Sequence, residues 1–166
     1  IESFKHVNNI AEEVETPVAF ATPIRKGDLI MVHHNVFRVF YDMKGIKKNS
    51  RSFLKDNLFF CAVDQVYLYK RTDTWKSFGD RCFVAPVKNK DILSADKVAD
   101  LIGILKIGNS SLEELRITPG HIVTFKAGSE WEFNIDGERL YCMKSNDILL
   151  EHGYKEDEEE YNPSWA

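Results

Sequence analysis

Apolar and polar residues alternate along much of this chain, in short runs that turn residues separate. In the clearest stretch, residues 117–150, a Pro-Gly turn precedes one alternating run and Asp136-Gly137 precedes a second. A period of two is typical of half-buried strands, and Asp-Gly between two such runs favours a hairpin. A fainter copy of this pattern spans residues 23–68. The sequence therefore predicts two small β units, written as a repeat.

The remaining pattern predicts more strands and very little helix. Strands are expected at 18–21, 29–41, 58–69, 80–87 and 103–107, where Val, Phe, Tyr and Ile cluster. Residues 42–57 are polar and basic, which favours an exposed loop or an extended hairpin tip, and 108–111 indicate a loop. One short helix is expected at 94–102, with Ser94 as its N-cap. Many short strands with almost no helix predict an all-β fold.

The predicted domains follow the repeat. They are a first β unit at 1–70, a linker at 71–78, a second β unit at 79–152 and an acidic tail at 153–166. The opening strand of the first unit is expected to lie before Ile1 or to be absent. Units of about 80 residues have small cores and gain from packing on neighbours, so we expect homo-oligomers.

Composition narrows the class of protein. The net charge of −4 argues against a nucleic-acid partner, whose phosphates attract basic surfaces. No apolar stretch is long enough for a membrane span, and no signal peptide is visible. Cys61, Cys82 and Cys142 each lie in an apolar run without CxxC spacing, which favours buried free thiols over a disulfide. We therefore expect a reducing, cytoplasmic location.

No motif in the chain indicates catalysis, a metal or a cofactor. A P-loop, a G-x-S-x-G motif and a dinucleotide fingerprint are all missing from the sequence. His33 and His34 would point to opposite faces of a strand and could not share one ion. The carboxylates Glu130, Glu132 and Asp136 are better explained as the solvated surface of a hairpin than as an acid/base pair. The sequence predicts a protein that is not an enzyme.

Four fragments of the second half, taken in order, resemble the GroES-like co-chaperonin family. They are Asp80-Arg81-Cys82-Phe83-Val84, Gly103-Ile104-Leu105-Lys106-Ile107-Gly108, Gly120-His121-Ile122-Val123-Thr124-Phe125, and the closing hairpin from Asp136-Gly137-Glu138 to Asp147-Ile148-Leu149. The first half resembles only the later part of such a unit. Residues 26–32 keep the Gly-Asp element of the family, with Asp28 where the second half has His121. Residues 58–66 also align with residues 140–148 without a gap.

The resemblance implies a degenerate form of the tandem co-chaperonins that occur in some plastids, with two partly open barrels, and leaves a phage origin open. Co-chaperonins form a ring that caps an ATP-bound chaperonin and closes its folding chamber. The chaperonin contact would come from the segment 88–102, either as a mobile loop or as a small helix packed on the barrel. The aliphatic candidates for this contact are Ile92 and Leu93, then Val98, Leu101 and Ile102. The expected subunit interface contains Arg81, Phe83, Asp147, Ile148, Leu149 and the aromatic Trp165 of the tail.

Two further possibilities stay open at this point. The protein could instead be a structural or assembly protein, for example of a virion, that reuses the same barrel with segment 88–102 packed. The basic stretch Lys44, Lys47, Lys48 and Arg51, with Phe53, is by default a solvated loop tip. Its best functional use would be to meet the acidic residues 156–160 of a neighbouring subunit.

Overall fold

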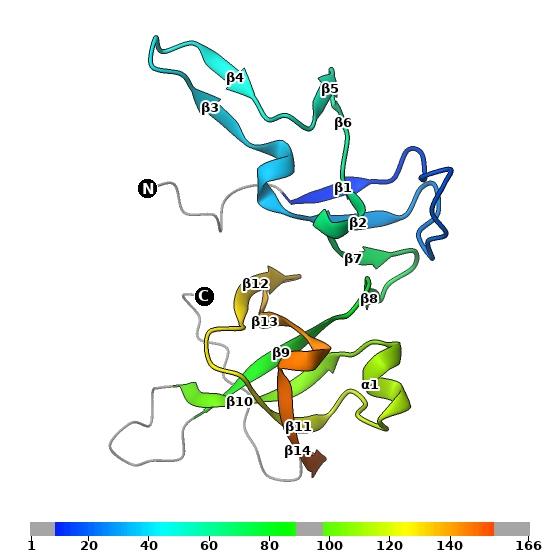
Figure 1. Ribbon diagram of the computed structural model, residues 1–166, viewed down its shortest axis with the longest axis vertical. Helices are drawn as coiled ribbons and strands as arrows, with labels where there is room; N and C mark the ends of the chain where they lie inside the picture. The colour runs from blue at the N-terminus through cyan, green and yellow to red at the C-terminus, as the bar shows by residue number, and fades with distance from the viewer. Residues whose placement is uncertain (1–8, 89–97, 155–166) are drawn as a thin grey trace. The chain divides into compact units, whose positions relative to one another are not determined.

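The computed structural model of the chain describes residues 9–88 and 98–154. It confirms the all-β prediction, because the described residues form antiparallel sheets with one short α-helix. The chain divides into two compact units between Phe78 and Gly79, called unit 1 and unit 2 below (Figure 1). No helix in the described residues is long and apolar enough to cross a membrane.

Unit 1 is built on a four-stranded antiparallel sheet. Its order is β1 (Ile10–Glu12), β2 (Leu29–Val32), β7 (Val66–Lys70) and β8 (Trp75–Ser77). The apolar side chains of these strands and their flanking turns form the core, which includes Ile24, Ile30, Val32, Val36, Val66 and Phe78. Burial of this apolar surface is the main source of its stability.

Two predictions for unit 1 were wrong. The expected linker 71–78 instead carries β8, and Trp75 and Phe78 bury their rings in the unit. The expected strand at 18–21 does not form, and Val18 is fully exposed. The first strand is instead β1, whose Ala11 packs against the core. In both segments the composition alone gives the wrong result, because pairing with a neighbouring strand decides whether a strand forms.

The connection from β2 to β7 leaves the main sheet. After a 3₁₀ turn, η2 (His34–Phe37), come two hairpins and a second 3₁₀ turn, η3 (Val63–Gln65). The first hairpin pairs β3 (Val39–Tyr41) with β4 (Lys47–Asn49), and the second pairs β5 (Phe53–Lys55) with β6 (Leu58–Phe59). The exposed loop or hairpin tip expected at 42–57 instead contains parts of two hairpins, with β4 in the first and β5 in the second. The strand expected at 29–41 is interrupted by η2.

Unit 2 has a six-stranded antiparallel sheet. Its order is β12 (Trp131–Ile135), β13 (Glu138–Lys144), β9 (Arg81–Lys88), β10 (Val98–Ile107), β11 (His121–Phe125) and β14 (Ile148–Tyr154). The Asp136-Gly137 hairpin joins β12 to β13 as expected, with both residues at positive φ. Its core contains Cys82, Val84, Leu105, Leu112, Val123, Phe125 and Met143.

Helix and loop were misplaced in the middle of unit 2. Residues 98–102 belong to β10 rather than to the expected helix, and residues 94–97 lie outside the described residues. The expected loop at 108–111 instead opens helix α1 (Ser110–Glu114). The side chain of Asn109 caps α1 by accepting a hydrogen bond from the Leu112 amide at 3.1 Å. The Asn-Ser-Ser-Leu-Glu sequence was the missed capping signal.

The predicted repeat is visible as one arrangement of strands in both units. Strand β2 lies between β1 and β7, just as β11 lies between β10 and β14. The pair Ala11 and Ile30 corresponds to the pair Gly103 and Val123. A 3₁₀ turn precedes the last strand of each set, η3 before β7 and η5 (Ser145–Asp147) before β14. The ungapped alignment of residues 62–66 with 144–148 therefore has a structural basis.

Gly103 allows β9 and β10 to approach closely, which gives the first prediction. A Cβ atom at this position would overlap the Val84 side chain and lie 2.6 Å from the Ala85 carbonyl oxygen. We expect Gly103→Ala to lower the free energy of unfolding by about 1–3 kcal/mol, because the strand must shift to accept the methyl group. Urea denaturation followed by circular dichroism measures this change.

Gly108→Ala is the matched control, because the nearest atom to its Cβ would be an ordinary contact at 3.6 Å. Equal stability of the two alanine variants would contradict the close approach at Gly103.

Candidate functional site

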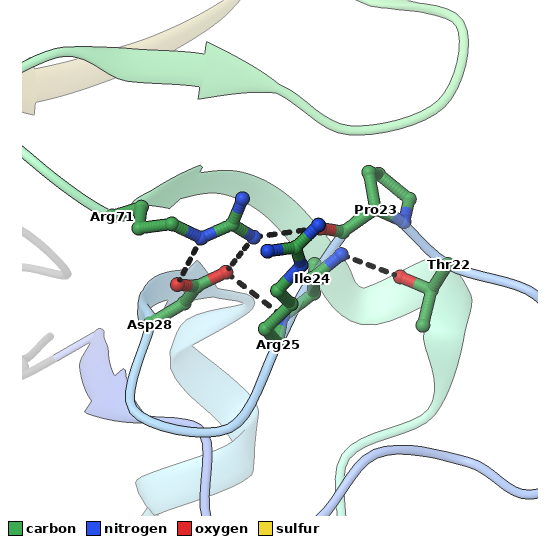
Figure 2. Close-up of polar contacts among 6 residues, drawn as sticks. All are labelled: Thr22, Pro23, Ile24, Arg25, Asp28 and Arg71. Atoms are coloured by element: carbon green, nitrogen blue, oxygen red, sulfur yellow. Dashed lines mark hydrogen bonds and ion pairs between the residues drawn. The ribbon is translucent and has the colours of Figure 1, made fainter.

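The first polar cluster of unit 1 is the corner at which the chain enters β2. Asp28 is buried, with 3% of its side chain exposed. Arg71 binds both of its carboxylate oxygens, Nε to Oδ1 at 2.9 Å and Nη2 to Oδ2 at 2.8 Å. The Arg25 amide donates to Oδ2 at 2.8 Å, and Arg71 also donates to the Pro23 carbonyl (Figure 2). The guanidinium thus joins the start of β2 to the residue that follows β7.

The hydrogen bonds and charge at this corner set its protonation. The Arg71 guanidinium holds the pKa of Asp28 below its usual range, and the Arg25 amide acts in the same direction against the effect of burial. Burial, and then the charge of Asp28, raises the pKa of the neighbouring Glu13. A buried, ionised carboxylate that accepts three hydrogen bonds from its own unit is best explained by a structural role.

Unit 2 has the same corner with a histidine in place of the aspartate. The Asp28 amide donates to the Arg25 carbonyl at 3.0 Å, and the His121 amide donates to the Thr118 carbonyl at 3.2 Å. The preceding Gly27 and Gly120 both have positive φ, which favours glycine. Nδ1 of His121 accepts from the Thr118 amide at 3.1 Å, as Asp28 does from Arg25. The duplicated corner is therefore a feature of the backbone that two different side chains satisfy.

The second feature of unit 1 is the exposed pair of hairpins, residues 38–61, which we call the arm. It projects from the sheet of unit 1 (Figure 1). At its base, the ring of Phe59 meets Phe37 and Phe53 edge to face, at centroid distances of 4.9 and 5.5 Å. Phe37 and Phe59 also pack against the core of unit 1. This aromatic cluster anchors both hairpins, so the arm starts from a fixed base.

Both faces of the β3–β4 hairpin are exposed and combine aromatic with basic side chains. Phe40 pairs with Lys48, and the next pair, Tyr41 with Lys47, points to the other face. The Asp42 carboxylate closes the turn by accepting from the amides of Lys44 and Ile46. The arm holds eight of the eighteen large exposed apolar residues of the described chain, namely Val39, Phe40, Tyr41, Met43, Ile46, Leu54, Leu58 and Phe60.

The arm is also strongly basic although the whole chain is acidic. It has six basic residues, Arg38, Lys44, Lys47, Lys48, Arg51 and Lys55, against the two acidic residues Asp42 and Asp56. All six are exposed, and none of their side chains forms an ion pair with a described residue. Exposed apolar surface rimmed by charge is typical of an interaction site. The arm is therefore the best candidate functional surface among the described residues.

The sequence located the basic part of the arm but missed its apolar part. Residues 39–41 were expected inside the strand 29–41, and they form the separate strand β3, in which all three are exposed. The available signal was their position, since a polar stretch with Gly45 follows them at once and leaves no second apolar run for them to cover.

The predicted chaperonin-binding residues fall at one end of β10. Ile92 and Leu93 lie outside the described residues. Val98 starts β10 and pairs with Lys88, the last residue of β9. Leu101 and Ile102 are also part of β10 and are partly buried, and Leu101 packs against the core of unit 2. The connection 89–97 thus has both ends held side by side by the strand pair.

The predicted interface residues are spread over two strands. Arg81 and Phe83 lie in β9, where the Phe83 side chain is buried in unit 2 and contacts Phe133 edge to face. Asp147 belongs to η5, and Ile148 and Leu149 begin β14. Trp165 lies outside the described residues. In the described sheet β14 is paired on one side only, and it exposes Leu149, Leu150 and Tyr154. This edge is a second candidate interaction surface.

The remaining candidate groups form no reactive centre among the described residues. The His33 and His34 rings stack at 4.3 Å, which corrects the prediction that they point apart, because η2 begins here instead of a strand. No group of three metal-ligating side chains occurs in the described parts of the chain. Glu132 pairs with Arg139, which also binds the Tyr141 hydroxyl.

All three cysteines are free. Burial raises the pKa of Cys82 and of Cys142 to about 12 and that of the half-buried Cys61 to about 11, so all three stay protonated and unreactive near neutral pH.

Comparison with known proteins does not assign a family. No family model matches the chain, and no curated protein matches it significantly in sequence.

The Asp28 corner gives the second prediction. The pKa of Asp28 is lowered in the folded state, so its stabilising effect is present above pH 4 or so and is lost as the pH falls through the folded value. We expect Asp28→Asn to lower the melting temperature of unit 1 at neutral pH by roughly 4–8 °C, a shift typical of losing one favourable interaction in a domain of this size.

The same variant should lose less stability than wild type on acidification below about pH 4, because it has no carboxylate to protonate at this site. Calorimetry across pH measures both effects. Asp73→Asn, at an exposed position, is the control. If the two variants lose stability in parallel with wild type as the pH falls, Asp28 does not carry the acid dependence.

Proposed function

We propose that this protein is a non-enzymatic, GroES-like co-chaperonin whose ring caps an ATP-bound chaperonin and closes its folding chamber. The observation that carries the proposal is the placement of the four family-like fragments. They fall in order on β9, on β10, on β11 and on the β12–β13 hairpin with η5 and β14. These strands form one antiparallel sheet, so the fragments belong to a single unit and are not scattered matches.

The duplicated corner adds support from unit 1. Fragments that resemble the Gly-Asp element start β2 and β11, and each is closed by the same main-chain hydrogen bonds. The His33 amide donates to the Gln65 carbonyl at 2.8 Å, and the Lys126 amide donates to the Asp147 carbonyl at the same distance. These matches support descent of both units from one kind of barrel-like module, as expected for a tandem co-chaperonin.

The proposed chaperonin contact is the connection between β9 and β10. Lys88 and Val98, the described residues on either side of it, pair with each other, and the nine residues of the connection lie outside the described residues. Ile92 and Leu93, which lie outside the described residues, are the proposed aliphatic contact with an apolar groove of the chaperonin. A single short contact of this kind is weak, and a ring would add the contacts of several subunits.

The ring itself is proposed to form through sheet edges. An edge strand presents unpaired N–H and C=O groups, and β14 combines such an edge with exposed Leu149 and Leu150. Pairing of this edge with a neighbouring subunit would give the backbone groups of β14 hydrogen-bond partners and would cover Leu149 and Leu150. Ile148 and Asp147 lie at the start of the same edge. The reducing cytoplasm is the proposed location, where three free thiols persist.

One observation favours a second candidate, a structural or assembly protein such as a virion component. The β3–β4 hairpin of the arm has no counterpart among the described residues of unit 2, and the β12–β13 hairpin, which corresponds to β5–β6, joins the main sheet. An exposed apolar and basic extension is what an assembly contact needs. The co-chaperonin proposal remains first, because it explains the ordered fragments of unit 2 as well as the repeat.

Binding to a chaperonin tests the proposal directly. We expect the full chain to be retained by an immobilised chaperonin ring with ATP or ADP and to be lost without nucleotide. The double variant Ile92→Ser/Leu93→Ser should bind at least about tenfold more weakly, since it removes the apolar contacts. Val18→Ser is the control, because Val18 is a fully exposed apolar residue of unit 1.

A wild-type chain that is never retained under any nucleotide condition would overturn the co-chaperonin role. Equal loss of binding in the Val18→Ser control would show that the contact is not at 92–93.

A further inference from the structure

The arm and the C-terminal segment carry opposite charges in the same chain. The arm has six basic and two acidic residues, all placed by the structure. The described structure ends at Tyr154, and twelve residues follow. Residues 156–160 are all acidic, Tyr161 comes directly after them, and Trp165 follows four residues later. Each segment thus combines a large excess of one sign of charge with aromatic side chains.

We propose that the arm is the docking surface for the acidic C-terminal segment, residues 155–166, of this chain. The cross-strand pairs Phe40 with Lys48 and Tyr41 with Lys47 place a cation beside an aromatic ring on each face of the hairpin. Lysines of these pairs attract the carboxylates of residues 156–160. The neighbouring rings then contact Tyr161 and Trp165, which are residue types favoured in binding hot spots.

The lengths of the two segments are compatible. Five extended residues, 156–160, span roughly 17 Å. Lys47 and Lys48 lie in β4, which spans about 10 Å as extended chain, and Lys44 and Arg51 lie in the turns on either side of it. Lys47 and Lys48 point to opposite faces, so an acidic run laid along the edge of β4 that is not paired with β3 can reach both. That is required because a single exposed ion pair contributes little.

A protein segment fits this surface better than a nucleic acid does. The chain as a whole carries a net charge of −4, which repels a polyanion of many phosphates. A short acidic segment is attracted by the nearby positive charges of the arm alone, because salt screens charges that lie more than about 8–10 Å away. Exposed apolar residues such as Met43 and Leu54 also favour a partner with apolar side chains.

The experiment measures binding of a fluorescent peptide of residues 155–166 to the full-length chain by anisotropy. The binding partner is a tail-neutralised chain, with Glu156, Glu158, Glu159 and Glu160 changed to Gln and Asp157 changed to Asn, so that its own segment does not compete. We expect this chain to bind the peptide about tenfold or more tightly than wild type, whose own segment occupies the arm. Binding should also weaken at least about tenfold between about 0.05 M and 0.5 M salt.

Charge reversal locates the site. Lys47→Glu/Lys48→Glu in the tail-neutralised chain should weaken binding at least about tenfold. Lys76→Glu/Lys126→Glu makes the same change in net charge at two exposed lysines outside the arm and should change binding less than about twofold. Equal weakening by both pairs would overturn the proposal, because it would show only a general effect of charge.

A nucleic acid is the alternative occupant of the arm. If a single-stranded oligonucleotide of similar charge binds the wild-type and tail-neutralised chains equally, and the peptide does not displace it, the arm serves nucleic acid and the proposal is wrong.

The dependence on protein concentration shows which copy supplies the segment. If inhibition of peptide binding by the wild-type segment increases with protein concentration, a second copy supplies the segment. If this inhibition is constant, the same copy supplies it. Either result supports the docking. Because no chaperonin enters this experiment, it stands or falls separately from the proposed function.

Discussion

The ion pair between Asp28 and Arg71 joins the start of β2 to the end of β7, at a position where the carboxylate is buried. The carboxylate is buried where the chain turns into β2, and the guanidinium comes from the end of β7, more than forty positions further along. The chain between Asp28 and Arg71 includes both hairpins of the arm, and the ion pair brings the two ends of this long segment together. A buried carboxylate without its partner would be costly, so the pair fixes the register of the two strands from which the arm is supported. At the equivalent corner of unit 2, the side chain of His121 accepts a hydrogen bond from the main-chain amide of Thr118 instead.

The β12–β13 hairpin of unit 2 and the equivalent β5–β6 hairpin of unit 1 pair differently, and this explains why, among the described residues, only unit 1 has an exposed arm. In unit 2 the β12–β13 hairpin pairs with β9 and extends the sheet. In unit 1, β1 pairs with β2 as β10 pairs with β11, and the described residues contain no counterpart of β9. The β5–β6 hairpin forms a separate two-stranded sheet. Its Phe53 and Phe59 pack at the base of the arm instead, and the outer residues stay exposed.

Much of the fold could be predicted from the sequence, because alternation and turn residues are local signals. The Asp136-Gly137 hairpin and the repeated Gly-Asp and Gly-His corners belong to this class. What could not be predicted depends on distant partners. Arg71 gives no local sign that it pairs with Asp28, and Trp75 looks like part of a linker until β8 pairs with β7. The candidate site divides in the same way: the lysines of the arm were evident from the sequence, whereas the exposure of Phe40 and Tyr41 follows from the pairing of β3 with β4 in a sheet separate from the main one.

We propose a division of roles in which unit 2 provides the chaperonin contact and unit 1 provides the arm for assembly. Electron cryo-microscopy of a chaperonin incubated with ATP and the full-length protein tests this most directly. The account predicts a ring of this protein over the chaperonin mouth, joined to it through the connection between β9 and β10. Chaperonin particles with open, unoccupied mouths at saturating protein would contradict it.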